Sequence, residues 1–175
     1  NIKHKAEIDA LTGIYNHITF ENKCSQRLKK CKSELLFMMF DLDDFKIIND
    51  TLGHNVGDLV LSQTGEILNE ILGDKGFAGR LGGDEFAVMA WGFTDEASMR
   101  QFCSDLRMNL KRIIFDMEYS ASIGVSFLKG RSLTFKDVYY EADQATYTAK
   151  RCGKNQIVYF DDITDKNNYD NVLNI

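Results

Sequence analysis

Proline is absent from this 175-residue chain, and cysteine, histidine and tryptophan are scarce. Without proline, a low-complexity run or a repeat, nothing marks an internal linker, so we predict one folded domain. Cys24, Cys31, Cys103 and Cys152 form no CxxC pair and no compact cluster with histidine. The spacing therefore excludes a zinc site or a disulfide framework, and we expect buried thiols.

Positive charge is also in deficit. The chain has 21 Lys and Arg against 26 Asp and Glu, a formal net charge of −5. Proteins that bind nucleic acid by neutralising its phosphates need a basic face, so the charge argues against nucleic acid as a partner. No apolar run approaches the roughly 20 residues that span a bilayer, and the N-terminus lacks the apolar core of a signal peptide. We expect a soluble, cytoplasmic domain.

Apolar patterns predict alternating helices and strands. Helices are expected over 18–28, from 58 to a stop at 73, from 94 to about 113, and from 134 to about 152. Five stretches read as strands, namely ELLFMMFDL (34–42), GFAGRL (76–81), FAVMAWGF (86–93), YSASIGVSF (119–127) and NQIVYF (155–160). This order, with one hairpin, predicts an α/β (α+β) sandwich with a mixed sheet covered by helices.

Three helix starts carry capping signals. Asp58 is predicted to cap the helix that follows NDTLGHNVGD (49–58). Thr94 is predicted to open the next helix. Thr134, with Asp137 three residues later, resembles a capping box.

Two adjacent acids stand at the predicted hairpin turn, in RLGGDEF (80–86). Asp84 and Glu85 lie at its tip, and Asp41 lies at the exit of the buried strand 34–42. If these three carboxylates converge, they need a raised pKa, a basic partner or a divalent metal, and hard oxygen ligands favour magnesium. The alternative is that Asp84 and Glu85 only solvate a turn.

The stretch FDLDDFKIINDTLGHNVGD (40–58) favours a binding site over a merely solvated turn. Acids, an amide and glycines are concentrated there in one strand-to-helix turn. Backbone amides in such a turn can bind phosphate.

Together these blocks resemble the GGDEF family, the catalytic domain of diguanylate cyclases. The resemblance runs from DALTGIYN (9–16) through the two stretches above, SASIGVSF (120–127) and EADQATYTAKRCGKN (141–155). It implies a central, mostly antiparallel five-stranded sheet surrounded by helices, akin to the palm of adenylate cyclases and polymerases. The implied activity is the condensation of two GTP into cyclic di-GMP, with release of pyrophosphate, by a homodimer whose half-sites face each other.

The resemblance also assigns residues. The implied metal ligands are Asp41, the backbone carbonyl of Leu42, Asp84 and Glu85, with Mg²⁺ as the metal and Mn²⁺ as an alternative. Asp84 is also the candidate proton acceptor, with Glu85 beside it as a second candidate, and the division of their roles stays open.

The implied substrate-binding residues fall into three groups. Asn49 and Asp58 would read guanine, the backbone of Gly82 and Gly83 would approach the nucleotide, and the phosphates would meet Lys150, Lys154 and the backbone amides of Asp44 and Phe45. Lys154 stands where the family usually has arginine, which turns a forked contact into a point charge. Asp43 and Asp50 are expected to be structural.

The resemblance sets the expected organisation. Residues 1–160 would form the GGDEF domain and 161–175 a polar tail. We expect an N-terminal sensor domain in the full-length protein, so the domain would be cytoplasmic either alone or as the output of a membrane-bound sensor. The alternative function is a catalytically silent GGDEF domain that binds GTP and regulates a partner.

Overall fold

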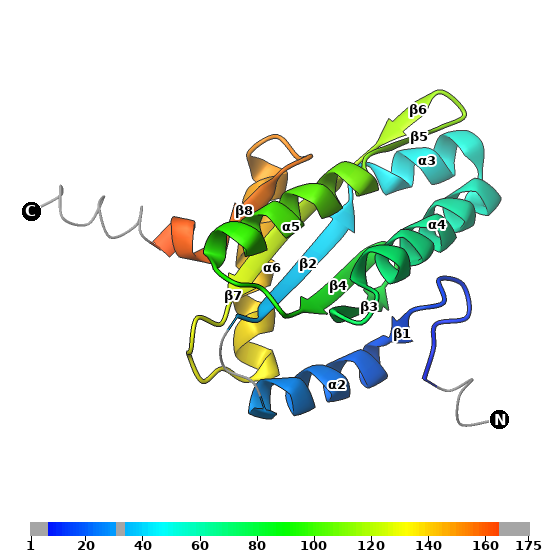
Figure 1. Cartoon of the computed structure of the whole chain (residues 1–175). Coiled ribbons are helices and arrows are strands. Elements are labelled where there is room, and N and C mark those ends of the chain that lie inside the picture. Colours follow the sequence, from blue (N-terminus) through cyan, green and yellow to red (C-terminus); the bar gives the residue numbers. More distant parts are fainter. Residues whose placement is uncertain (1–6, 31–33, 165–175) are drawn as a thin grey trace, which may run out of the picture.

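The centre of the molecule is a six-stranded sheet (Figure 1). The computed structural model describes residues 7–30 and 34–164. In spatial order the strands are β1 (Tyr15–Asn16), β3 (Gly76–Gly82), β4 (Glu85–Ala90), β2 (Leu36–Leu42), β7 (Ala121–Phe127) and β8 (Ile157–Tyr159). The four inner strands pair antiparallel, and β1 and β8 run parallel to their neighbours.

The predicted α/β sandwich with a mostly antiparallel sheet is therefore confirmed. The predicted number of five strands needs one correction, because Tyr15–Asn16 add a sixth strand beside β3. Two residues are too few to show the alternation by which a strand is detected in a sequence.

Helices cover both faces of the sheet (Figure 1). α3 (Phe45–Leu52), α4 (His54–Leu72) and α5 (Glu96–Leu110) pack on one face, and α2 (His17–Lys30) and α6 (Phe135–Arg151) pack on the other. Alternate residues of β2 serve the two cores: Leu36, Met38 and Phe40 join the α4–α5 side, and Phe37 and Met39 join the α2–α6 side. Because side chains alternate along a strand, Asp41 continues the series that faces α6.

A separate two-stranded hairpin, β5 (Arg112–Ile114) and β6 (Met117–Tyr119), leads into β7. It takes up residues predicted to end the helix that starts near 94, so that helix stops at Leu110 instead of Ile113. Its N-cap is Asp95, not Thr94, because the Asp95 carboxylate accepts a hydrogen bond from the backbone N–H of Ser98 at 2.8 Å.

Of the other three predictions of helix ends, two are confirmed and one is wrong. Gly73 ends α4 and Thr134 forms a capping box with Asp137, as predicted. The prediction for Asp58 is wrong, because α4 begins at His54 and contains Asp58 in its second turn. Gly53, with φ +89°, joins α3 to α4 directly and leaves no room for a separate helix start at residue 58.

The cysteines follow their prediction in part. Cys24 and Cys103 are buried, Cys152 is exposed, and Cys31 lies outside the described residues. In the predicted polar tail, residues 161–164 are helical and 165–175 lie outside the described residues.

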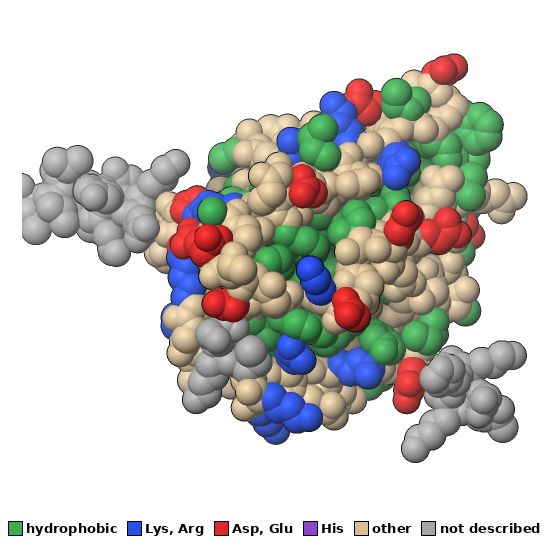
Figure 2. Space-filling model, in the orientation of Figure 1, with side chains coloured by type: hydrophobic (Ala, Val, Ile, Leu, Met, Phe, Trp, Pro, Cys, Tyr) green, Lys and Arg blue, Asp and Glu red, His purple; other side chains and the backbone are tan. Residues whose placement is uncertain are grey.

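Figure 2 shows basic and acidic side chains interspersed over the face that carries α4 and α5. Within the described part of the chain, no helix is long and apolar enough to cross a membrane.

Candidate active site

The site is organised by the close contact of α6 with the sheet. A Cβ on Gly124 of β7 would stand 2.1 Å from the carbonyl oxygen of Ala142 and 2.3 Å from the backbone nitrogen of Thr146. Only glycine lets the helix backbone approach β7 this closely. The Thr146 hydroxyl also reaches the carbonyl oxygen of Met39 on β2 at 3.2 Å. These contacts fix the rotation of α6 about its axis, and so fix which of its residues face the strand ends.

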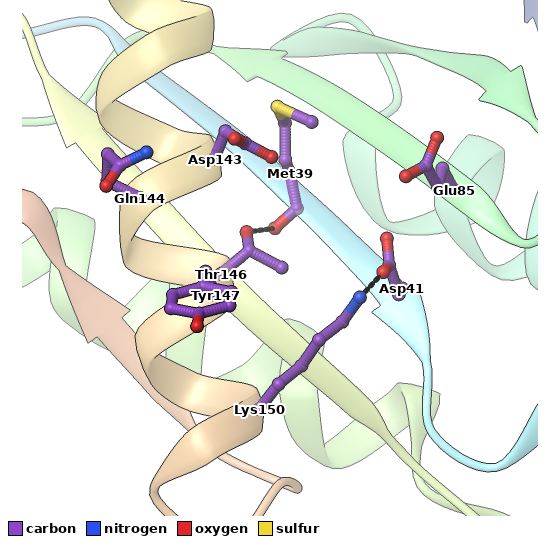
Figure 3. A pocket seen from close by; sticks show the side chains of 8 residues that line it. All are labelled: Met39, Asp41, Glu85, Asp143, Gln144, Thr146, Tyr147 and Lys150. Atoms are coloured by element: carbon purple, nitrogen blue, oxygen red, sulfur yellow. Dashed lines mark hydrogen bonds and ion pairs between the residues drawn. The ribbon is translucent and has the colours of Figure 1, made fainter.

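An open pocket of about 270 Å³ lies between α6 and the adjoining ends of β2 and β4 (Figure 3). It is lined by Met39, Asp41, Glu85, Asp143, Gln144, Thr146, Tyr147 and Lys150. Residues 143, 146, 147 and 150 recur at spacings of three and four, so they form one stripe of the helix. Residues of β2 and β4 therefore form the bottom of the pocket, and one face of α6 forms its side.

Two predicted residues face each other across the strands of this pocket. Asp41 and Glu85 are paired in register on antiparallel β2 and β4, so their side chains project from the same face. Asp41 is buried and forms an ion pair with Lys150, drawn as a dashed line in Figure 3. Partial burial and the neighbouring carboxylates of Asp84 and Asp143 raise the pKa of Glu85.

Asp84 lies in the hairpin turn beside this pocket and is not among the residues that line it. Its carbonyl oxygen accepts a hydrogen bond from the Leu42 backbone N–H at 3.3 Å, which ties the turn to the end of β2. Arg80 closes the turn by donating from Nε and Nη2 to the Gly83 carbonyl at 2.9 and 2.8 Å. Burial raises the pKa of Asp84, and the charge of Arg80 opposes that rise.

The two glycines of the motif border open space. A Cβ built on Gly82 or Gly83 would meet no atom of the protein within 4 Å, although the positive φ of Gly83, +48°, itself favours glycine. No other atom of the described residues therefore lies against the Cα atoms of these two turn residues.

A second buried acid, Asp43, connects three segments of the chain through hydrogen bonds. It accepts hydrogen bonds from the hydroxyls of Ser120 at 2.7 Å and Ser122 at 2.5 Å, and from the backbone N–H of Asn155 at 2.9 Å. These bonds connect the end of β2, the start of β7 and the turn after α6. Asp43 thereby brings the Lys154 turn to the start of α3.

At that start, Asp44 is the N-cap residue of α3 in a left-handed conformation, with φ +56°. Its side chain makes no cap hydrogen bond and instead accepts one from Lys154 Nζ at 2.6 Å. Both side chains are about half exposed. The predicted phosphate contacts Asp44, Phe45 and Lys154 thus lie together beside the end of β2.

The predicted guanine-reading residues lie on the neighbouring helices α3 and α4. A Cβ on Gly57 would stand 1.8 Å from Oδ1 of Asn49 and 3.2 Å from Cζ of Phe45, so Gly57 creates the space that Asn49 occupies. Within the described part of the chain, the side chains of Asn49 and Asp58 have no hydrogen-bond partner.

The described residues have suitable ligand chemistry for a metal ion but no ready-made group of three ligands. Across 7–30 and 34–164, no three His, Cys, Asp or Glu side chains are grouped closely enough to hold a metal ion. The predicted convergence of Asp41, Asp84 and Glu85 on one point is therefore not seen. The donor chemistry does fit Mg²⁺, since the pocket joins the carboxylates of Asp41 and Glu85 and carries three carboxylates against one ammonium.

Sequence reasoning missed Asp143, Tyr147 and Arg80. The first two share the helical stripe of Lys150, so the spacing from Lys150 on a predicted helix was a usable signal. For Arg80 no such signal existed, because its role depends on the path of the turn.

A family profile described as "Diguanylate cyclase, GGDEF domain" matches residues 6–156. The chain belongs to the GGDEF family. Among curated relatives, it is 31% identical over 169 residues to the probable diguanylate cyclase DgcT of Escherichia coli, covering 92% of this chain and 36% of that protein. It is 32% identical over 167 residues to the cyclic di-GMP phosphodiesterase NbdA of Pseudomonas aeruginosa, covering 91% of this chain and 21% of the relative.

This GGDEF chain also matches solved structures. The crystal structure of the coiled coil and GGDEF domain of DgcB from Caulobacter crescentus, in complex with c-di-GMP, has a TM-score of 0.79 and 23% identity. The match covers 90% of this chain and 87% of that one, and it establishes the GGDEF fold. The chain spans only 36% and 21% of the lengths of the two curated relatives above.

Proposed function

We propose that this GGDEF domain is a diguanylate cyclase that condenses two GTP into cyclic di-GMP and two pyrophosphates. The supporting observation is the meeting of Asp41, Glu85 and Lys150 in one pocket at the end of β2. Carboxylates that can hold a divalent cation, beside an ammonium that can contact phosphate, suit a metal-bound triphosphate. Family membership and the similarity to a probable diguanylate cyclase point the same way.

For the metal, we assign Asp41, the carbonyl of Leu42, Asp84 and Glu85 as ligands of Mg²⁺, with Mn²⁺ as an alternative. When bound, the ion would neutralise triphosphate charge and polarise the α-phosphate. The pairing of Asp41 with Glu85 in register supports this assignment, because it sets two carboxylates side by side.

For the phosphates, we assign Lys150, Lys154 and the backbone amides of Asp44 and Phe45. The start of α3 favours negative charge, because helix N-termini present unpaired N–H groups and the positive end of the helix dipole. The Lys154–Asp44 contact supports the grouping of this lysine with that turn.

For the base, we assign Asn49 and Asp58. A carboxylate can accept from the N1 and N2 donors of guanine, and an amide can pair with O6 or N3. Adenine lacks that donor edge, so this pair favours GTP over ATP. The open space above Gly82 and Gly83 would let the nucleotide lie against the hairpin backbone.

In each half of the reaction, the 3′-oxygen of one GTP bonds to the α-phosphorus of the other. The bond from that phosphorus to the α,β-bridging oxygen breaks, and pyrophosphate leaves with the bonding electrons. The hydroxyl proton passes to the carboxylate of Asp84 or Glu85, the two candidate proton acceptors beside the reacting groups. Because two such steps close the ring, two domains must face each other as a homodimer.

We propose residues 1–160 as this catalytic domain, with the polar tail 161–175 outside it. Since the curated relatives above are much longer than this chain, we further propose that the domain is the cytoplasmic output of a larger sensor protein, either free or membrane-bound, with its sensor domain on the N-terminal side.

The test is to incubate the purified domain with GTP and Mg²⁺ and to measure cyclic di-GMP and pyrophosphate by chromatography. The wild-type domain should form both, and Asp84→Ala should lose turnover while it still binds GTP. The competing function is a catalytically silent receptor for GTP. Wild-type protein that binds GTP and forms no product would contradict the cyclase and support the receptor.

A further inference from the structure

Lys150 has an unusual position in the candidate pocket. Of the eight described residues that line it, Lys150 alone is positively charged, and it shares the pocket with the carboxylates of Asp41, Glu85 and Asp143. Figure 3 shows its ammonium reaching from α6 to Asp41. The side chain of Asp41 is only 13% exposed, whereas that of Lys150 is 42% exposed. The pair thus joins a buried acid to a partly exposed base.

This ion pair is the one polar contact of the Asp41 side chain within residues 7–30 and 34–164. A buried carboxylate without a partner is costly, so Lys150 is the counter-ion that stabilises Asp41 when no other cation is present. A divalent cation at Asp41 would stand against that ammonium, and like charges at contact distance repel. Lys150 and a metal ion therefore compete for the same carboxylate.

Building on the proposed function, we propose that Lys150 is an exchangeable counter-ion that makes metal binding depend on nucleotide. In the nucleotide-free protein, the ammonium of Lys150 pairs with Asp41 and prevents a metal ion without nucleotide from binding there. When a nucleotide binds, its triphosphate takes over the ammonium, and Asp41 is released to the metal that arrives with the nucleotide. Since binding free energies are linked, nucleotide and metal each tighten the other by the same factor.

The surrounding structure suits this exchange. Gly124 and Thr146 hold α6 against the sheet, so the helix need not move. Lys150 lies one turn beyond Thr146 on a flexible four-carbon stem that is partly in solvent, so rotation of its own side chain is sufficient.

The nearby Lys154 provides a matched comparison. It also belongs to the proposed phosphate contacts, but its ammonium pairs with Asp44, and both partners are about half exposed. Removing Lys154 takes away the same charge from the same neighbourhood without freeing Asp41.

The experiment measures binding of Mn²⁺ alone to the nucleotide-free protein by electron paramagnetic resonance of free Mn²⁺. Lys150→Met should bind Mn²⁺ about tenfold more tightly than the wild type, the effect of losing a competitor in a half-buried ion pair. Lys150→Arg and Lys154→Met should stay within about twofold of the wild type, since the first keeps the competing charge and the second never held Asp41. Circular dichroism confirms that each variant folds.

Two further results bear on the proposal. Adding Asp41→Asn to Lys150→Met should cancel the gain in Mn²⁺ affinity. A non-hydrolysable GTP analogue should raise the Mn²⁺ affinity of the wild type and remove the advantage of Lys150→Met. The proposal is overturned if Lys150→Met binds Mn²⁺ no more tightly than the wild type, or if Lys154→Met gains as much.

The same preparations separate this proposal from the proposed function. A tenfold gain in Lys150→Met, with no cyclic di-GMP from the wild type, would leave the counter-ion standing and the cyclase rejected. Cyclic di-GMP from the wild type, without any gain in Lys150→Met, would do the reverse.

Discussion

Asp41 and Asp43 stand two residues apart at the end of β2 and are almost equally buried, at 9% and 7% exposure. Their partners are of different kinds. Asp43 accepts three hydrogen bonds, from the hydroxyls of Ser120 and Ser122 and from the backbone N–H of Asn155. Among the described residues, the side chain of Asp41 makes a polar contact only with the ammonium of Lys150, at the end of a flexible stem. Burial alone therefore does not separate a structural acid from the acid proposed to bind metal, and the two differ instead in the kind of partner that each side chain has.

The largest expected effect is on catalysis at Asp41. Asp41→Ala should lower the rate of cyclic di-GMP formation on the order of 10³-fold, because it removes a proposed ligand of the metal. Its unfolding free energy should change by less than about 1 kcal/mol, since Lys150 becomes solvated. Chromatographic initial rates and urea unfolding measure the two. A rate within about tenfold of the wild type would remove Asp41 from the site.

The next effect is on stability at Asp43. Asp43→Ala should lower the unfolding free energy by about 3 kcal/mol, because three donors lose their acceptor in a buried place. Urea unfolding measures it, with the exposed Asp50→Ala as the control that should stay within about 0.5 kcal/mol. If Asp43→Ala were as stable as the wild type, the contrast between the two buried acids would be lost.

A smaller effect concerns Gly57. Gly57→Ala should raise the KM for GTP roughly tenfold, because its Cβ would displace Asn49 from the space it now occupies. Steady-state kinetics measure this change. In an Asn49→Ala background the same substitution should have little further effect, because the clash is gone. Equal effects in the two backgrounds would show that Gly57 does not position Asn49.

The smallest effect is on the pH dependence of stability. Burial raises the pKa of Asp84 above its ordinary value of 3.8, so the folded state holds this proton more tightly than the unfolded state. Its contribution to the unfolding free energy is full below that value and is lost as pH rises through the raised pKa. Asp84→Asn, which stays neutral, should gain stability relative to the wild type over this rise. Urea unfolding at several pH values measures the difference, and a constant difference would contradict it.

Much of the fold followed from the sequence, because the strongest patterns are local. The apolar run of β2, the glycines of the hairpin and the capping box of α6 each predict their own element. The prediction that Asp58 caps a helix failed because α4 already begins at His54. Nothing in the local sequence excludes a helix start four residues later, at Asp58.

The site followed less completely. The family pattern marked Asp41 and Lys150, but their pairing joins residues far apart in the chain and depends on where α6 rests on Gly124. Asp143 was missed for the same reason, because the rotation of α6 about its axis determines that this residue lines the pocket. Asp43 was expected to be structural, and its three partners come from segments that meet only in the folded chain.

The most direct test of the central claim is the initial rate of cyclic di-GMP formation from GTP and Mg²⁺ over a wide range of protein concentrations. A cyclase that acts across two facing half-sites predicts a rate per protein that rises with concentration and then levels off once the dimer is complete. No cyclic di-GMP at any concentration at which GTP is bound would contradict the account.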